Sequence, residues 1–399
     1  MKPLTGTRVL DFTRILSGPY CSLLLADMGA EVIKVERHDR GDDTRAWGPP
    51  FLDDERTVST YFGALNRGKR SISLDFRAPT TRDVLLRLCK HADVVIENFR
   101  PGVGERLGLS WPVLRDSNPA IVFCTISGFG HSGSYSELPA TEIVVEGMSG
   151  LMEITGPADG DPVRFGIAMI DIAAGLTAAT RIVASLMRAR ETGEGAYVDC
   201  SLYAAALAAM GTSIAAFSAT GKEPKRWGSH HPSIVPYGGF PTADGHLITG
   251  VVNDAMWPAF CEALELHELA QEQRYRTNGG RVEHRAELLA EVAKRCLERP
   301  TAQWLKRLRE RGLLAAPIRT VGQAVRDPAT REMGLLVGLE GFPGVYSTTI
   351  DGTRALDHEQ RVPQLGEHTH EVLGEVAGLS QKEIEDLLGS VLAPQRSRV

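Results

Sequence analysis

Short apolar segments alternate with amphipathic segments along the first third of the chain. Residues 31–37 and 71–76 show the two-residue alternation of a β-strand, and the other short apolar segments are also typical of strands. The predicted strands are residues 8–12, 31–37, 71–76, 93–96 and 120–126, and the predicted helices between them are residues 19–28, 80–91 and 103–107. Strands punctuated by helices predict βαβ units and a mainly parallel sheet, so the predicted fold class is α/β.

The pattern changes after Gly211. An alanine-rich helical stretch gives way to residues 220–225, a linker-like segment, and then to strand-like residues 236–252 around an Ala-Asp-Gly turn. Helical patterns follow to about residue 311, and residues 313–321 again suit a strand. The predicted organisation is a large domain beginning with residues 1–215, a small domain of residues 225–325, and a return to the large domain over residues 330–399.

An acidic residue, Asp171, opens a long helical pattern in the middle of the chain. Apolar positions then recur at helical spacing, namely Ile172, Leu176, Ala179, Val183, Leu186 and Met187. Asp is a preferred helix N-cap, because its carboxylate accepts the free N–H groups of the first turn. A carboxylate held in this way stays ionised and aimed, which a nucleophile also requires. The pattern alone leaves Asp171 as a helix cap, a nucleophile, or both.

Composition narrows the possible functions. A chain of 399 residues is long enough for about two domains. Its net charge of −6 has the wrong sign for a nucleic-acid-binding face. We see no signal peptide and no apolar run that approaches a membrane span, so no membrane partner is expected. The six cysteines are widely spaced without a Cys-x-x-Cys pair, which disfavours disulfides and zinc and favours a cytoplasmic location.

Two local motifs have familiar interpretations that their surroundings disfavour. Residues 128–133 match G-x-G-x-x-G, the signature of an NAD-dependent oxidoreductase, but residues 134–139 contain a proline instead of the required helix. A tight glycine loop at the end of a strand is therefore the favoured interpretation. The pair His230-His231 has no acid or cysteine beside it and lies in a loop rich in proline and glycine. His368 and His370 are flanked by Glu367 and Glu371, but adjacent residues rarely converge on one ion, so no metal site is expected.

Basic residues recur near the predicted strand ends. Open α/β sheets bind ligands at the carboxyl ends of their strands, and arginine or lysine there favours phosphate. We therefore expect an anionic, phosphate-bearing ligand. The residues concerned are Lys34, Arg37, Arg67, Lys69, Arg70, Arg77, Arg100 and Arg106.

A series of motifs in a fixed order resembles the class III CoA-transferases, the CaiB/BaiF family. The motifs include Val-Leu-Asp-Phe-Thr-Arg at residues 9–14, Asn-Arg-Gly-Lys-Arg-Ser-Ile at 66–72, Glu-Asn-Phe-Arg-Pro-Gly at 97–102 and Ser-Gly-Phe-Gly at 127–130. Further matches lie at residues 25–36, 41–45, 149–152, 161–164, 193–195 and 365–369. The resemblance therefore covers essentially the whole chain.

This resemblance implies roles for particular residues. The family nucleophile is an Asp that opens a helix after a stretch of small residues, and Asp171 matches it. Glu142 matches an acidic position near the active site, beside Thr141, which replaces a family tyrosine. Leu16 replaces a glutamine that helps an oxyanion in formyl-CoA transferases. The positions that match CoA-contacting residues are Ile15, Arg37, Leu74, Arg77, Asn98, Phe99 and Arg106.

The resemblance also implies a reaction and an assembly. CoA would move from an acyl-CoA to another carboxylic acid through a covalent aspartyl anhydride and thioester, with CoA as substrate and no tightly bound cofactor. Residues 154–157, 161–164, 225–228 and 233–237 look most like the succinate–hydroxymethylglutarate branch, which uses short dicarboxylates. The related α-methylacyl-CoA racemases need a histidine base, and Thr141 stands at its position. The family fold is a Rossmann-like large domain plus a smaller α+β domain, and two chains interlock as a homodimer.

Overall fold

The structure is a computed structural model that describes residues 2–56, 58–350 and 359–392. The chain divides into two compact units. The first comprises Met1–Leu151, Phe165–Ser218 and Pro328–Val399, and the second comprises Met152–Arg164 and Ala219–Asp327. The predicted α/β fold class is confirmed, because the first unit is built on a six-stranded sheet with helices on both faces.

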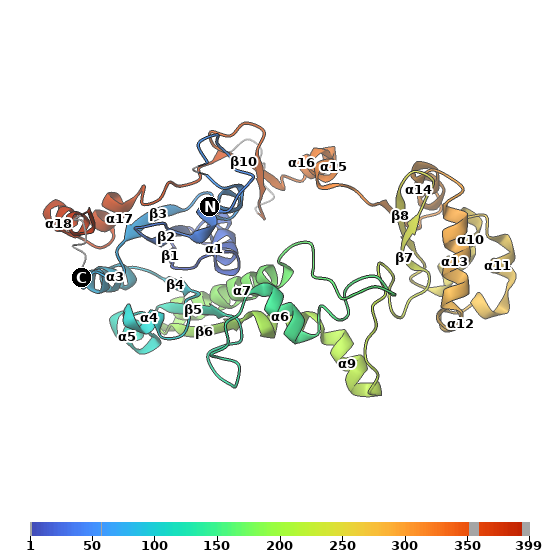
Figure 1. The fold of residues 1–399 in the computed structure, drawn as a ribbon, viewed down its shortest axis with the longest axis horizontal. Helices are drawn as coiled ribbons and strands as arrows, with labels where there is room; N and C mark the ends of the chain where they lie inside the picture. Colours follow the sequence, from blue (N-terminus) through green and yellow to red (C-terminus); the bar gives the residue numbers. More distant parts are fainter. Residues whose placement is uncertain (1, 57, 351–358, 393–399) are drawn as a thin grey trace, which may run out of the picture. The chain divides into compact units, whose positions relative to one another are not determined.

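All six strands of this sheet are parallel and follow the order β3-β2-β1-β4-β5-β6 (Figure 1). They are β1 (Arg8–Asp11), β2 (Glu31–Arg37), β3 (Arg70–Leu74), β4 (Val94–Glu97), β5 (Val122–Ser127) and β6 (Ala196–Ser201). The five strands predicted from the sequence are present within about two residues of their predicted bounds, while β6 was not predicted. The strand order reverses between β1 and β4, which is where such sheets bind ligands at their carboxyl edge.

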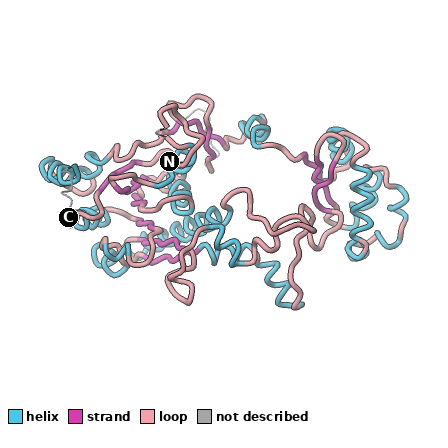
Figure 2. Tube along the Cα trace, viewed as in Figure 1, coloured by secondary structure: helices cyan, strands magenta, loops and turns pink. Residues whose placement is uncertain are grey.

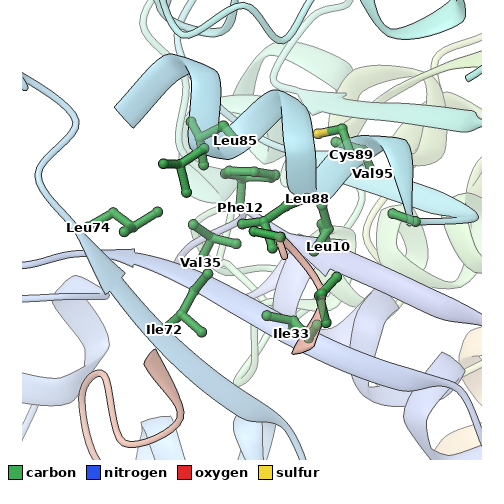
Figure 3. Close-up of a cluster of buried hydrophobic side chains, with 14 of the residues drawn as sticks. Leu10, Phe12, Ile33, Val35, Ile72, Leu74, Leu85, Leu88, Cys89 and Val95 are labelled. Carbon is green, nitrogen blue, oxygen red and sulfur yellow. The ribbon is translucent and has the colours of Figure 1, made fainter. Parts of the chain in front are cut away.

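One face of the sheet is covered by α3 (Thr81–Lys90), α5 (Trp111–Ser117), α17 (Thr369–Glu375) and α18 (Gln381–Leu392). Figure 3 shows Leu85, Leu88 and Cys89 of α3 above strand residues that include Leu10, Ile33 and Ile72. These side chains are buried because alternate strand residues point to the same face. This cluster is the apolar core on that face of the sheet.

The other face is covered by α1 (Ser17–Asp27) and α7 (Met169–Thr192), which pack against each other. The buried positions of α7 are mostly small, among them Ala174, Gly175 and Ala178. The predicted apolar face was partly wrong, because Leu176 and Met187 are exposed. Helical spacing selects large apolar residues, whereas close packing against α1 requires small ones. A Cβ atom on Gly175 would lie 2.7 Å from the carbonyl oxygen of Ser17.

The remaining helices of the first unit are short. They are α2 (Thr60–Asn66), α4 (Val103–Arg106), α6 (Glu142–Ser149), α8 (Leu202–Ala209), α9 (Gly211–Thr220) and α16 (Pro328–Glu332). By length and composition, α7 and the bent pair α8–α9 would each qualify as membrane-crossing segments, contrary to the sequence-based expectation. In α7, however, the buried small residues pack against α1 and the sheet.

The C-terminal segment returns to the first unit and joins elements from its beginning. A small sheet of β10 (Leu336–Leu339), β11 (Tyr346–Thr348) and β12 (Glu359–Gln360) buries Leu339 against Phe62 of α2. The fully buried Arg67 guanidinium pairs with the Asp27 carboxylate at 2.8 and 3.0 Å and also donates to the carbonyl of Thr348 at 2.6 Å. One arginine therefore ties together α1, the end of α2 and the returning segment.

The second unit combines an antiparallel sheet with a cluster of helices (Figure 2). Its strands are β7 (Tyr237–Pro241), β8 (His246–Gly250) and β9 (Leu314–Pro317), paired in that order. Its helices are α10 (Trp257–Ala263), α11 (His267–Gln271), α12 (Asn278–Glu283), α13 (Arg285–Cys296), α14 (Thr301–Arg309) and α15 (Val321–Arg326). The strand predicted over residues 313–321 is shorter than expected, because α15 begins at Val321.

Candidate active site

Asp171 lies in the first turn of α7, on the helix face that packs against α1. The helix begins at Met169 and its N-cap is Ala168, so Asp171 is inside the helix and is not its N-cap. The capping hypothesis is therefore wrong in its simple form. An acidic side chain in the first turn still benefits from the positive end of the helix dipole.

The environment of Asp171 makes its carboxylate costly to ionise. Burial raises the pKa of Asp171 to about 6, and a hydrogen bond from the Ser17 side chain opposes that rise. Ser17 is the first residue of α1 and is itself buried. A carboxylate in this position is mostly ionised at neutral pH but has lost much of its hydration, which favours nucleophilic reactivity.

Two glutamates lie one turn apart on α6, a helix that contacts α7 and α8. Glu142, the second predicted acidic site residue, is the first residue of α6 and is buried. Glu146 is fully buried, and its Oε1 accepts the Phe165 N–H at 3.2 Å. Phe165 leads into the small-residue stretch before α7. Glu146 thus helps to fix the approach to Asp171, a role that the sequence did not predict.

The loop between β1 and α1 carries Ile15, the first predicted CoA-contacting residue. Ile15 has a φ of 73°, a left-handed conformation that is rare for a β-branched residue. Its N–H donates to Oδ1 of Asp42 at 3.3 Å. The loop ends at Leu16, the N-cap of α1, immediately before Ser17. It therefore links the carboxyl end of β1 directly to the partner of Asp171.

Three predicted arginines lie at or near the carboxyl edge of the sheet. Arg37 is the last residue of β2, and its buried Nε and one terminal nitrogen have no hydrogen-bond partner among the described residues. The guanidinium lies 3.6 Å from Asp43 and 3.9 Å from Asp39, too far for hydrogen bonds to these carboxylates. Arg77 and Arg106 are exposed beyond β3 and on α4. An anionic group could satisfy the donors of Arg37.

Leu74, Asn98 and Phe99 also lie at this edge, but their side chains have internal partners. Leu74 is buried in the apolar core under α3. The ring of Phe99 packs against Phe12 and Phe76, with centroid distances of 6.4 and 6.5 Å. The Asn98 carboxamide binds the backbone of the β1–α1 loop. The structure thus brings the predicted residues to one edge of the sheet, while their contacts with CoA stay a prediction.

The wider set of basic residues is largely unsuited to binding phosphate, contrary to the sequence-based expectation. Lys34, Lys69 and Arg67 are buried and pair with Asp42, Asp11 and Asp27 at 2.8–3.1 Å. Arg70 opens β3 at the opposite edge of the sheet and pairs with Glu31 and Glu371. The sequence pattern cannot distinguish a basic residue beside a strand end from one that neutralises a buried carboxylate.

The local motifs behave largely as expected. No helix directly follows Gly128–Gly133; the next helix, α6, starts at Glu142, so the glycine-loop interpretation is confirmed. The ring of His231 accepts the Ser233 N–H at 3.0 Å, and the ring of His368 accepts the Ser71 N–H at 3.2 Å. The His231 ring thus supports its own loop, whereas the His368 ring joins the C-terminal segment to β3.

A pocket of about 190 Å³ lies beside β4 and β5, among residues of α4, α5 and β6. Glu97 lines it, and burial raises the pKa of Glu97 to about 7 despite a 2.6 Å hydrogen bond from the Phe99 N–H. Aromatic residues Trp111, Phe123 and Tyr197 form much of the wall. Glu97 shapes the turn that presents Asn98 and Phe99 at the sheet edge.

Comparison with known proteins gives a concordant result along the chain. Residues 4–369 match CoA-transferase family III. The chain is 40% identical to succinyl-CoA:glutarate CoA-transferase of Mus musculus over 402 residues, covering 99% of this chain and 91% of the mouse protein. It is 39% identical to succinate–glutarate CoA-transferase of Agrobacterium fabrum over 382 residues, covering 94% and 96% of the two chains. A solved CaiB/BaiF family protein from Brucella suis has a TM-score of 0.83 and 38% identity, with coverage of 94% and 99%.

Proposed function

The chain belongs to CoA-transferase family III, and we propose that it moves CoA from succinyl-CoA to a second short dicarboxylic acid, with glutarate as the first candidate. The proposal about the substrates rests on the relatives from mouse and Agrobacterium. The observation that carries the chemistry is the position of Asp171 in the first turn of α7, where burial raises its pKa to about 6.

In the proposed reaction Asp171 is the nucleophile, and its carboxylate forms three covalent intermediates in turn, two of them in the first half of the reaction. An Asp171 oxygen attacks the thioester carbonyl of the donor, the C–S bond breaks, and a mixed anhydride and CoA thiolate result. The thiolate then attacks the Asp171 carbonyl carbon, which releases the donor as a free carboxylate and leaves an aspartyl-CoA thioester. No net proton transfer is needed in these two steps.

The second half of the reaction repeats this chemistry with the acceptor. The acceptor carboxylate attacks the aspartyl-CoA thioester, CoA thiolate leaves, and a new anhydride forms. The thiolate finally attacks the acceptor acyl carbon and frees Asp171. Because an anhydride hydrolyses readily, the site must keep water away from it. The partial burial of Asp171 and the close packing of α1 on α7 support this requirement.

We propose that CoA binds at the carboxyl edge of β1 to β4, with Arg37, Arg77 and Arg106 facing its phosphate groups. The orphaned donors of Arg37 support this placement, since a phosphate oxygen would satisfy them. Ile15 and Phe99 lie at the same edge. We further propose that Glu142 is a second acidic group of the site and that CoA is carried as a substrate, with no tightly bound cofactor.

We also propose a cytoplasmic homodimer whose two chains interlock. Helix α9 supports this proposal, because none of its residues is buried and its exposed apolar side chains, Ile214 and Phe217, could be covered by a partner chain. The six cysteines are all free and buried, which suits a reducing compartment. Sedimentation over a wide concentration range tests the dimer: interlocked chains should not dissociate on dilution, and a reversible equilibrium with folded monomers would exclude interlocking.

The substrate proposal is tested with a panel of acids. Purified protein is incubated with succinyl-CoA and glutarate, other short dicarboxylates, oxalate, formate or carnitine, and new CoA thioesters are identified by mass. We expect transfer to the short dicarboxylates and little to formate or carnitine. Transfer confined to monocarboxylic acids would refute the dicarboxylate assignment while leaving the family intact.

A further inference from the structure

The middle of the β1–α1 loop is held by side chains, whereas its two ends make backbone hydrogen bonds. Four side chains, from Asp11, Lys34, Asp42 and Asn98, bind five successive backbone groups of Thr13, Arg14 and Ile15, and we call these four residues the loop clamp. The Thr13 N–H donates to Asp11 at 2.9 Å, and the Thr13 carbonyl accepts from Lys34 at 2.8 Å. The Ile15 N–H donates to Asp42 at 3.3 Å.

Asn98 holds the central peptide group of this loop from both sides. Its Oδ1 accepts the Arg14 N–H at 3.0 Å, and its Nδ2 donates to the Arg14 carbonyl at 2.8 Å. Only a carboxamide can offer an acceptor and a donor in this arrangement. The oxygen and the nitrogen of the Asn98 side chain are therefore both engaged with protein backbone.

The rest of the loop clamp is charged and fully buried. Lys34 and Asp42 pair at 2.9 Å with no exposed side-chain surface, and Asp11 pairs with Lys69 at 3.1 Å in the same condition. Burial would raise the pKa of Asp11, but the ammonium groups of Lys69 and Lys34 hold that pKa well below its usual range. Buried ion pairs contribute little net stability compared with apolar packing. A role in fixing the geometry of the β1–α1 loop therefore accounts better for these buried charges.

The loop also carries backbone strain. The left-handed conformation of Ile15, with a φ of 73°, is strained for a residue with a Cβ atom, and such strain persists only where surrounding contacts enforce it. Two residues later, Ser17 begins α1 at the point where this helix packs against α7, and its carbonyl oxygen would lie 2.7 Å from a Cβ atom on Gly175, one turn after Asp171. A strained loop held by buried side chains thus ends where α1 meets the helix turn that carries the proposed nucleophile.

We propose that Asn98 is a positioning residue, which holds the β1–α1 loop so that Ser17 orients Asp171, and that its side chain is not a CoA ligand. This inference rests on the proposed function. It differs from the expectation drawn from the family resemblance, in which Asn98 contacts CoA. The two roles predict different kinetics, because a positioning residue affects the chemical step and a ligand affects CoA binding.

The kinetic test uses Asn98→Leu, which removes both hydrogen bonds at similar size, and Asn98→Asp, which keeps only the acceptor. For both variants we expect kcat to fall at least tenfold and the Kd for free CoA to change less than twofold. The effects of Asn98→Leu and Ser17→Ala should combine to less than the product of the single effects, because one acts through the other. A tenfold rise in Kd with unchanged kcat, or fully multiplicative effects, would overturn the proposal.

Asn118→Leu provides a matched control. Asn118 also makes two hydrogen bonds to backbone, donating to the Ala92 carbonyl at 2.8 Å and accepting the Ala120 N–H at 3.2 Å, just before β5. This variant should lose comparable stability but keep kcat within twofold. If Asn118→Leu lowers kcat as much as Asn98→Leu does, the role of Asn98 is only structural and the proposal fails.

A second measurement does not depend on transfer activity. Amide hydrogen exchange in the free protein should accelerate over residues 13–18 in Asn98→Leu and not in Asn118→Leu. Unchanged exchange over these residues would show that Asn98 does not hold the loop. If the wild-type protein transferred CoA to no acid, the proposed function would fail, whereas the exchange result would still decide whether the loop depends on Asn98.

Discussion

Replacement of Gly175 by alanine would add one methyl group where α7 packs closely against α1. The new Cβ atom would lie 2.7 Å from the Ser17 carbonyl oxygen and 3.1 Å from a ring carbon of Tyr20. Ordinary contact begins at 3.4 Å, so the two helices must separate locally by about 0.7 Å. Gly175 lies one turn after Asp171 on the same helix face, and the separation therefore acts directly on the contact between Ser17 and the first turns of α7.

Two effects on stability oppose each other in this variant. Overpacking typically costs about 1–3 kcal/mol, whereas replacing a mid-helix glycine by alanine gains about 1 kcal/mol. We therefore expect a net loss of about 0–2 kcal/mol, visible as a drop of a few degrees in Tm. The effect on catalysis should be larger, because a misplacement near 1 Å costs up to about 100-fold in rate.

The assay compares initial rates of CoA transfer from succinyl-CoA with thermal melting of the same preparations. Gly389→Ala serves as the control, because Gly389 lies in helix α18 and an added Cβ atom there would meet nothing within 4 Å. That control should keep full activity. A Gly175→Ala variant that melts near the wild-type temperature and transfers CoA within twofold of the wild-type rate would refute the argument that this contact sets the position of Asp171.

Three further predictions follow from the charged groups of the site. In Asp171→Asn the transfer rate should fall by orders of magnitude while CoA still binds, and substantial activity in this variant would disprove the role of Asp171 as nucleophile. In the wild type, hydroxylamine added during turnover should modify Asp171, which is detected by peptide mass. The transfer rate should rise with pH through about 6 and then level off as Asp171 ionises. Because the pKa of Asp171 in the folded protein exceeds the value of 3.8 in the unfolded chain, the stability of the wild type relative to Asp171→Asn should decrease as the pH rises from about 4 to about 6, measured by denaturant unfolding at each pH. Lys69→Met should lose about 3–5 kcal/mol in the same measurement at pH 7, because it strands the buried Asp11 carboxylate, and Lys69→Met combined with Asp11→Asn should recover part of that loss.

Much of the fold follows from local sequence patterns, because strands of a parallel sheet are short apolar segments with helices between them. The family resemblance drawn from ordered motifs is confirmed over residues 4–369, and with it the prediction of a CoA-transferase. The pattern failed on α7, where packing depends on alanine and glycine. The contribution of Ala174 and Gly175 becomes visible only when α1 is seen against them.

The candidate site was less predictable than the fold, because its contacts join distant parts of the sequence. Lys34 and Arg37 lie three residues apart in one strand, yet Lys34 is fully paired inside the protein and Arg37 keeps buried donors without hydrogen bonds. No feature of the neighbouring sequence distinguishes these two basic residues. The contact between Ser17 and Gly175 joins residues more than 150 positions apart, and the two hydrogen bonds between Asn98 and Arg14 join residues 84 positions apart. Such pairings come from tertiary structure.

The Arg67 junction has a consequence for how the protein is made. Arg67 and Asp27 meet near the start of the chain, but the Thr348 carbonyl that completes their bonding is synthesised about 280 residues later. Helices α17 and α18, which cover part of the apolar core under α3, emerge from the ribosome later still. The first unit therefore cannot complete this core until the end of translation, whereas the second unit is complete earlier. Nascent chains should leave the exposed strand face available to chaperones until translation reaches α18.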